Sequence, residues 1–231
     1  MDDAVNQHLQ SGTPMPLTVL IVDDEPALNE LFVIGLNKYG FKTEGVLGGQ
    51  ECLDLLSTEY RPDLILLDMM MEPMDGWETL NHLKKIQDIK RIPVIMQTGK
   101  NLTYKEAVQF SYCIEDYIMK PITPKRCIDY ITGALEKVRL IEIIIETGLH
   151  AGYPEEKIRR FAQIYRTINV AKRMLIILEE RYGSRIGDDG DENFGPEEYA
   201  EFLHKLEEEI NLLKSEIDMN LFKVPLHKLT E

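Results

Sequence analysis

Acidic side chains follow two apolar stretches of this sequence, at the point where each stretch ends. Asp68 closes the run Leu64–Leu67, and Asp23 and Asp24 follow a run over residues 17–22. Uninterrupted apolar runs of this length are typical of strands buried on both faces of a parallel sheet, whose ligands gather beyond the carboxyl ends of the strands. Three carboxylates gathered there repel one another, and a hard divalent cation such as Mg²⁺ relieves that repulsion. The acids therefore predict a magnesium site.

A hydroxyl and an ammonium group follow two further apolar runs. Thr98 comes shortly after a run over residues 92–96, and Lys120 follows a run over residues 114–119. If all four runs are neighbouring parallel strands, their ends bring these two groups to the acids. A cation, a lysine and a hydroxyl donor around one carboxylate suit an anion with three equatorial oxygens, namely a phosphoryl group. We therefore expect Asp68 to be the nucleophile that accepts it.

At these positions the sequence resembles the receiver domain of two-component response regulators. The shared positions occur in the family's order and are Asp23, Asp24, Asp68, Met74, Asp75, Gly76, Thr98, Gly99, Lys120 and Pro121. Gaps of 44, 30 and 22 residues separate Asp24, Asp68, Thr98 and Lys120, and these gaps suit the family well. The resemblance implies a receiver domain over residues 17–135, and the polar residues 1–16 before it predict a flexible leader. The alternative is that the acids and Thr98 only cap helices and that Lys120 is a surface residue.

The resemblance implies a role for each side chain of the site. Asp68 would be the phosphoacceptor, and Thr98 and Lys120 would bind phosphoryl oxygens. The ligands of Mg²⁺ would be Asp23, Asp24, Asp68 and the backbone carbonyl of Met70. Tyr117, three residues before the lysine, falls at the family's aromatic switch and would respond to movement of Thr98. The implied phosphodonor is a phosphohistidine on a sensor histidine kinase.

Strand and helix patterns alternate through residues 17–135, which predicts an α/β fold. We expect a doubly wound, five-stranded parallel sheet with right-handed crossovers, as in flavodoxin-like receivers. The expected strands lie at residues 17–22, 41–46, 64–68, 92–96 and 114–119, and the expected helices at 26–39, 50–60, after Gly76 and at 103–110. Pro26 presets the first turn of its helix.

From Pro124 onward the pattern indicates helices only. One helix continues from Pro124 to about Gly148, a second begins at Pro154, and a third runs from Pro196 to about residue 217. We expect an all-α module over residues 136–231, continuous with the last receiver helix. Its apolar stripes step by threes and fours, as in a coiled coil. Because three such stripes exceed what we expect so short a module to bury, we predict a bundle completed by homodimerisation. The alternative is that the stripes pack only on each other and on the receiver.

Charge argues against direct DNA binding, which is the alternative function for the helical module. The net charge is −14, with 12 basic against 20 acidic residues through residue 135 and 14 against 20 after it. The third helix carries the acidic run Glu207–Glu209. Neither half of the chain has the excess of basic residues that binding to the phosphate backbone of DNA needs. The second helix is locally basic, which we interpret as a solvated face, at Arg159, Arg160, Arg166, Lys172 and Arg173.

Other features of the sequence indicate a cytoplasmic signalling protein rather than an enzyme. The three cysteines lack metal-ligand spacing and predict unpaired thiols in a reducing compartment. No apolar stretch approaches ~20 residues, so we expect no membrane span. No second catalytic constellation follows residue 135, so the output is expected to pass to a downstream protein target. Asp189, Asp191 and Asn193 alternate as in a calcium loop, but Phe194 stands where that loop needs glycine, so we expect a solvated loop.

Overall fold

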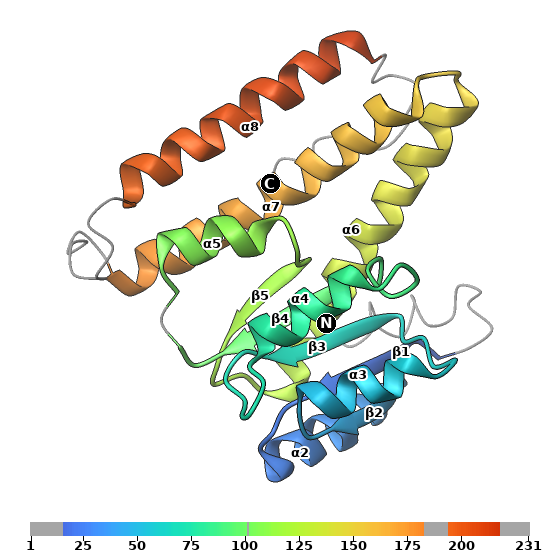
Figure 1. Ribbon diagram of the computed structural model, residues 1–231, viewed down its shortest axis with the longest axis vertical. Coiled ribbons are helices and arrows are strands. Elements are labelled where there is room, and N and C mark those ends of the chain that lie inside the picture. Colours follow the sequence, from blue (N-terminus) through green and yellow to red (C-terminus); the bar gives the residue numbers. More distant parts are fainter. Residues whose placement is uncertain (1–15, 101, 183–193, 218–231) are drawn as a thin grey trace. The chain divides into compact units, whose positions relative to one another are not determined.

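The computed structural model describes residues 16–100, 102–182 and 194–217 (Figure 1). Within these ranges, strands and helices alternate up to Met119, and only helices follow it. The strands are β1 (Thr18–Val22), β2 (Lys42–Val46), β3 (Leu64–Asp68), β4 (Val94–Thr98) and β5 (Asp116–Met119). The helices are α2 (Pro26–Asn37), α3 (Gly49–Ser57), α4 (Gly76–Lys85), α5 (Tyr104–Ser111), α6 (Pro124–His150), α7 (Glu155–Tyr182) and α8 (Pro196–Glu216).

The five strands form one sheet in the order β2-β1-β3-β4-β5. The pairs β1–β2, β1–β3 and β4–β5 are parallel. This order is that of flavodoxin-like doubly wound sheets, in which the carboxyl ends of the strands lie at one edge. The predicted fold class is therefore confirmed, with every expected strand and helix present and boundaries shifted by only a few residues.

The chain divides into two compact units, one of residues up to 92 with 122–128, the other of 93–121 with 129 onward. The first unit holds β1, β2 and β3. Strand β3 lies in the core of this unit. Every residue from Leu64 to Asp68 is buried, as the uninterrupted apolar run predicts. Helix α2 ends two residues before the predicted Tyr39. The chain then turns at Gly40, whose φ of +89° is a conformation that glycine adopts without strain.

In the second unit the helices α6, α7 and α8 bury their apolar stripes on one another. The members of this core are Ile141, Ile144, Ile158, Phe161, Ala162, Ile164, Tyr165, Ile168, Leu206, Ile210 and Ile217. Helix α7 also packs against α5 and β5, and α8 packs against α5 (Figure 1). The stripes are thus covered largely within the chain, so the premise that they need a second copy is wrong. Homodimerisation itself stays a prediction.

The basic side chains of α7 form ion pairs and stay 35–49% exposed, which agrees with the interpretation of this helix as a solvated face of the bundle. Within the second unit, α7 pairs with acids of α8 and with the two acids at the start of β5. The nitrogen–oxygen distances are 2.6 Å for Arg160–Glu209, 2.7 Å for Lys172–Glu207, 2.9 Å for Arg166–Glu115 and 3.9 Å for Arg173–Asp116, and Arg159 pairs with Glu155 of its own helix at 2.6 Å. Apart from Glu155, these partners lie outside α7 and far from it along the chain, so the sequence alone did not reveal them.

Two cysteine thiols, those of Cys52 and Cys127, are buried. Burial raises the pKa of both Cys52 and Cys127 to about 12, so neither thiol is ionised near neutral pH. None of the helices in the described ranges is long and apolar enough to cross a membrane. The predicted leader up to residue 15 and the acidic loop with Asp189, Asp191 and Asn193 lie outside the described residues.

Candidate functional site

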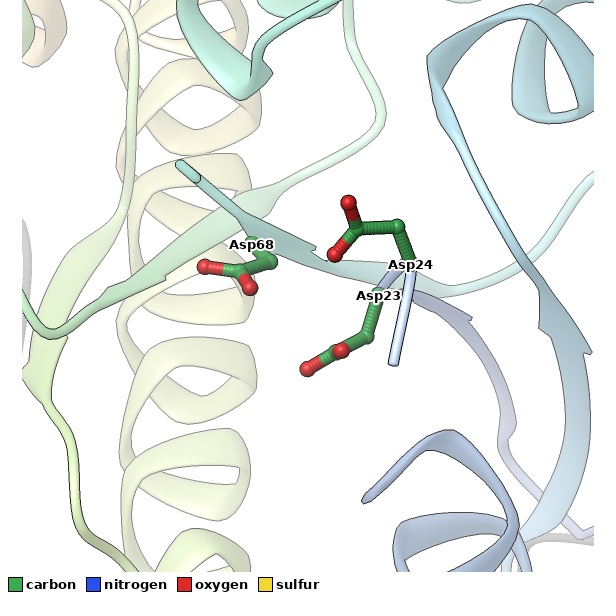
Figure 2. A group of neighbouring side chains, drawn as sticks. All are labelled: Asp23, Asp24 and Asp68. Atoms are coloured by element: carbon green, nitrogen blue, oxygen red, sulfur yellow. The ribbon is translucent and has the colours of Figure 1, made fainter. Parts of the chain in front are cut away.

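Three carboxylates meet where β1 and β3 end. Val22 pairs with Leu67 in the parallel register, so Asp23 and Asp68 lie on adjacent strands at the same edge of the sheet. Asp23, Asp24 and Asp68 each offer an oxygen, and these oxygens lie within 4.8 Å of one another (Figure 2). Asp23 and Asp68 are 3% and 6% exposed, and Asp24 is half-buried. Buried like charges this close favour a bound cation.

Backbone N–H groups orient all three carboxylates. The N–H of Glu25 donates to Asp23 Oδ1 at 3.0 Å, and the N–H of Met70 donates to Asp68 Oδ1 at 3.2 Å. Asp24 Oδ2 accepts from the N–H of Glu72 at 3.2 Å. These three bonds tie the acids to the two loops that follow β1 and β3, so the cluster is preorganised by the backbone.

The loop after Asp68 returns closely to the end of β3. The N–H of Gly76 donates to the carbonyl of Met69 at 3.0 Å, and a Cβ at position 76 would lie 2.1 Å from the carbonyl oxygen of Asp68. Only glycine fits this approach. Asp75 then caps α4, its side chain accepting from the N–H of Glu78 at 2.7 Å. The Met-Asp-Gly motif thus shapes the loop beside the acids.

Asn29 is a positioning residue that the sequence did not suggest. Its side-chain Nδ2 donates to the carbonyl of Asp23 at 3.3 Å and to that of Val46 at 2.8 Å. Asn29 therefore links the ends of β1 and β2 and fixes the backbone that carries the acidic pair. A polar residue on the buried side of α2 was the only signal in the sequence. Gly45 leaves room for it, since a Cβ there would lie 2.0 Å from Asn29 Oδ1.

The second unit brings Thr98 and Lys120 together at the ends of β4 and β5. The N–H of Lys120 donates to the carbonyl of Thr98 at 2.8 Å. Thr98 is fully buried, and its hydroxyl accepts from the N–H of Lys100 at 2.9 Å. Tyr117 is also fully buried, and its ring stacks on Phe110 of α5 with centroids 6.3 Å apart. The predicted switch residues therefore lie on one strand pair, with the tyrosine already inside the core.

The family model for the response regulator receiver domain matches residues 19–132. These residues form a response regulator receiver domain. Receiver domains take a phosphoryl group on an aspartate and bind Mg²⁺ at an acidic cluster, and the three carboxylates of this chain are such a cluster. Their hard oxygen donors are the kind that Mg²⁺ prefers, so the residues fit the ion.

Curated relatives match about half of this chain. The DNA-binding response regulator MtrA of Mycolicibacterium smegmatis is 33% identical over 119 residues, which are 52% of this chain and 50% of that protein. A Vibrio cholerae protein named "Probable cyclic di-GMP phosphodiesterase" is 34% identical over 116 residues, 50% of this chain and 26% of its own. The chain thus spans half or less of these relatives.

A solved structure is also similar to part of this chain. The N-terminal domain of a response regulator receiver protein from Methanoculleus marisnigri has 46% sequence identity and a TM-score of 0.43. The similarity covers 49% of this chain and 92% of that one.

Proposed function

We propose that this protein is a two-component response regulator that accepts a phosphoryl group from a sensor histidine kinase on Asp68. The observation that carries the proposal is the set of three carboxylate oxygens within 4.8 Å of one another in a receiver domain. Asp68 lies on the strand end, held by the N–H of Met70, so one of its oxygens can attack phosphorus. The O–P bond forms as the P–N bond of the phosphohistidine breaks, and the histidine leaves.

Asp23, Asp24, Asp68 and the backbone carbonyl of Met70 would hold Mg²⁺. When bound, the ion supplies positive charge against the phosphoryl oxygens. Lys120 would add a second positive charge, and the hydroxyl of Thr98 would donate a hydrogen bond to a phosphoryl oxygen. The bond between the N–H of Lys120 and the carbonyl of Thr98 supports this joint role, because it keeps the two residues side by side.

We assign residues 17–135 to the receiver and residues 136–231 to a helical output module that acts on a downstream protein target in the cytoplasm. Direct DNA binding by this module is the less favoured function. MtrA is a DNA-binding protein, but its alignment spans only 52% of this chain. The basic side chains that a DNA-binding helix would need, such as Arg160 and Lys172 of α7, are paired with acids of α8.

The test of phosphoacceptance is intact-mass spectrometry after incubation with phosphoramidate and Mg²⁺. We expect the chain to gain one phosphoryl group only when Mg²⁺ is present. The variant Asp68→Asn should gain none, and the matched control Asp88→Asn, at an exposed aspartate, should gain one as the native chain does. Equal phosphorylation of the native chain and Asp68→Asn would contradict the assignment.

A homodimer through the helical module is the second part of this proposal. Ile143, Ile176 and Leu212 are apolar side chains of α6, α7 and α8 that stay 42%, 46% and 61% exposed, which supports a further contact. Sedimentation velocity with and without Mg²⁺ and beryllofluoride, a phosphoryl mimic, measures it. We expect a dimer in at least one of the two conditions, and a monomer in both would contradict the homodimer.

A further inference from the structure

Four aromatic rings join α8 to α5 in the second unit. Tyr104 of α5 packs edge to face on Tyr199 of α8, with ring centroids 5.6 Å apart. Tyr112, which follows α5, packs in the same way on Phe202 of α8 at 5.8 Å, and Tyr199 and Phe202 pack on each other at 5.7 Å. We call these four rings the aromatic clasp. It fixes α8 along both ends of α5.

The clasp is anchored on its α8 side by a buried hydrogen bond. The hydroxyl of Tyr199 donates to the carbonyl of Ala171 in α7 at 2.8 Å, and the tyrosine is fully buried. A buried hydroxyl without a partner would be costly, so this bond selects one position of α8 on α7. The ring of Tyr199 therefore contacts α5 only while α8 keeps that position.

A series of polar contacts connects Thr98 with α5, the helix that carries the other half of the aromatic clasp. The hydroxyl of Thr98 accepts from the N–H of Lys100 at 2.9 Å, and the ammonium of Lys100 pairs with Glu106 at 2.8 Å. Glu106 lies in the first turn of α5 and forms a capping box with Thr103, accepting from its N–H at 3.0 Å. Glu106 is two residues from Tyr104 on the same helical turn.

The electrostatics of Glu106 agree with a tightly held link. Burial alone would raise the pKa of Glu106, but the hydrogen bonds from Lys100 and Thr103 outweigh it and lower that pKa. The carboxylate is thus held ionised between the lysine and the helix terminus. A shift of Lys100 would change the forces on the first turn of α5.

We propose that α8 is held on α5 by the aromatic clasp and that phosphorylation of Asp68 loosens it through Thr98, Lys100 and Glu106. The inference rests on the proposed function. Once the hydroxyl of Thr98 donates to a phosphoryl oxygen, the backbone at Lys100 follows it, and the ammonium no longer holds Glu106 in place. The first turn of α5 then shifts, Tyr104 loses its contact with Tyr199, and α8 is released from the receiver.

Hydrogen exchange of the full chain tests this, with the backbone amides of α8 as the readout and Mg²⁺ with beryllofluoride as the probe. We expect exchange over residues 199–216 to become several-fold faster when the probe binds. Asp68→Asn should not respond. Exchange in α8 that stays unchanged or slows while the probe is bound would overturn the inference. Failure of the native chain to bind the probe, followed by the emission of Trp77, would overturn the proposed function as well.

Two variants test the link itself. Lys100→Met should remove at least half of the probe-dependent change, and Glu106→Gln should do the same while keeping the capping box, since glutamine also serves in it. The matched control is Lys205→Met, which removes an exposed lysine from a 2.7 Å pair with Glu201 and should leave the change intact. A native response in both Lys100→Met and Glu106→Gln would overturn the role of the Lys100–Glu106 pair.

Discussion

The rings of Tyr104 and Tyr199 meet at an interplanar angle of 62°, with their centroids 5.6 Å apart, and so join the short receiver helix α5 to α8. The hydroxyl of Tyr199 donates to the carbonyl of Ala171 at 2.8 Å. One side chain of α8 thus contacts both α5 and α7. It is among the largest fully buried side chains of the chain.

Substitutions of Tyr199 should separate its hydrogen bond from its ring contact. Tyr199→Phe loses the bond to Ala171, and we expect the free energy of unfolding to fall by about 1 kcal/mol. Tyr199→Leu should lose about a further 0.5–1.5 kcal/mol, because the aromatic pair is lost as well. Urea denaturation measures both. Tyr39→Phe, at an exposed tyrosine, is the control and should change stability by less than about 0.5 kcal/mol.

Alanine at two glycines should have opposite effects. Gly76→Ala forces a Cβ against the carbonyl of Asp68 and should lower the free energy of unfolding by about 1–3 kcal/mol. Gly133 lies inside α6, and a Cβ added there would meet nothing within 4 Å, so Gly133→Ala should raise stability by about 0.5–1 kcal/mol through helix propensity. Thermal unfolding of both variants measures this. A neutral Gly76→Ala would contradict the tight loop.

The single tryptophan offers a direct readout of the acidic cluster. Trp77 follows Gly76, where an added Cβ would lie 2.1 Å from the carbonyl oxygen of Asp68, so Mg²⁺ at the cluster should change its fluorescence. We expect Asp24→Asn to weaken Mg²⁺ affinity at least about tenfold, because one of three carboxylate donors is lost. Asp88→Asn, an exposed control, should titrate like the native chain. Equal affinities in all three proteins would exclude Asp24 as a ligand.

The sequence predicted the sheet and the acidic cluster because both depend on local signals. The run Leu64–Leu67 is long enough and apolar enough to be a buried strand, and the carboxylate that closes it can only lie at the strand end. The positions of Asp23 and Asp24 follow from the same reasoning on β1. The positions of Thr98 and Lys120 were predicted in the same way, from the ends of two further apolar runs. The two residues lie side by side at the ends of β4 and β5.

The contacts of α7 and α8 could not be read from the sequence. Periodicity shows that α7 has an apolar face, but it does not say that Arg166 pairs with Glu115 or that Tyr199 packs on Tyr104. These partners are distant in sequence and depend on how the helices pack. Asn29 was missed for a similar reason, since its two carbonyl partners lie at the ends of different strands, directly after β1 and at the last residue of β2.

Asp116 should make stability depend on pH in the direction opposite to most carboxylates. Burial raises its pKa above the ordinary 3.8, although Lys137, the N–H of Tyr117 and Arg173 act in the opposite direction. A raised folded-state pKa adds stability that is fully present below pH 3.8 and is lost as the pH rises through the folded value. Asp116→Asn removes this loss.

The measurement is urea denaturation of both proteins from below pH 3.8 to neutral pH. The stability of Asp116→Asn relative to the native chain should increase as the pH rises through the folded pKa of Asp116. Asp129→Asn, at an exposed aspartate, serves as the control and should show a smaller trend. A relative stability of Asp116→Asn that falls with rising pH would show that the pair with Arg173 outweighs burial.

The most direct test of the account is to trap the acyl phosphate and locate it. Borohydride reduces a phosphorylated aspartate to homoserine, which peptide mass spectrometry assigns to one position. After incubation of the full chain with phosphoramidate and Mg²⁺, we predict homoserine at position 68, and none when Mg²⁺ is removed by chelation. Homoserine at another aspartate, or none at position 68 in a chain shown to be folded, would contradict the phosphoacceptor role of Asp68.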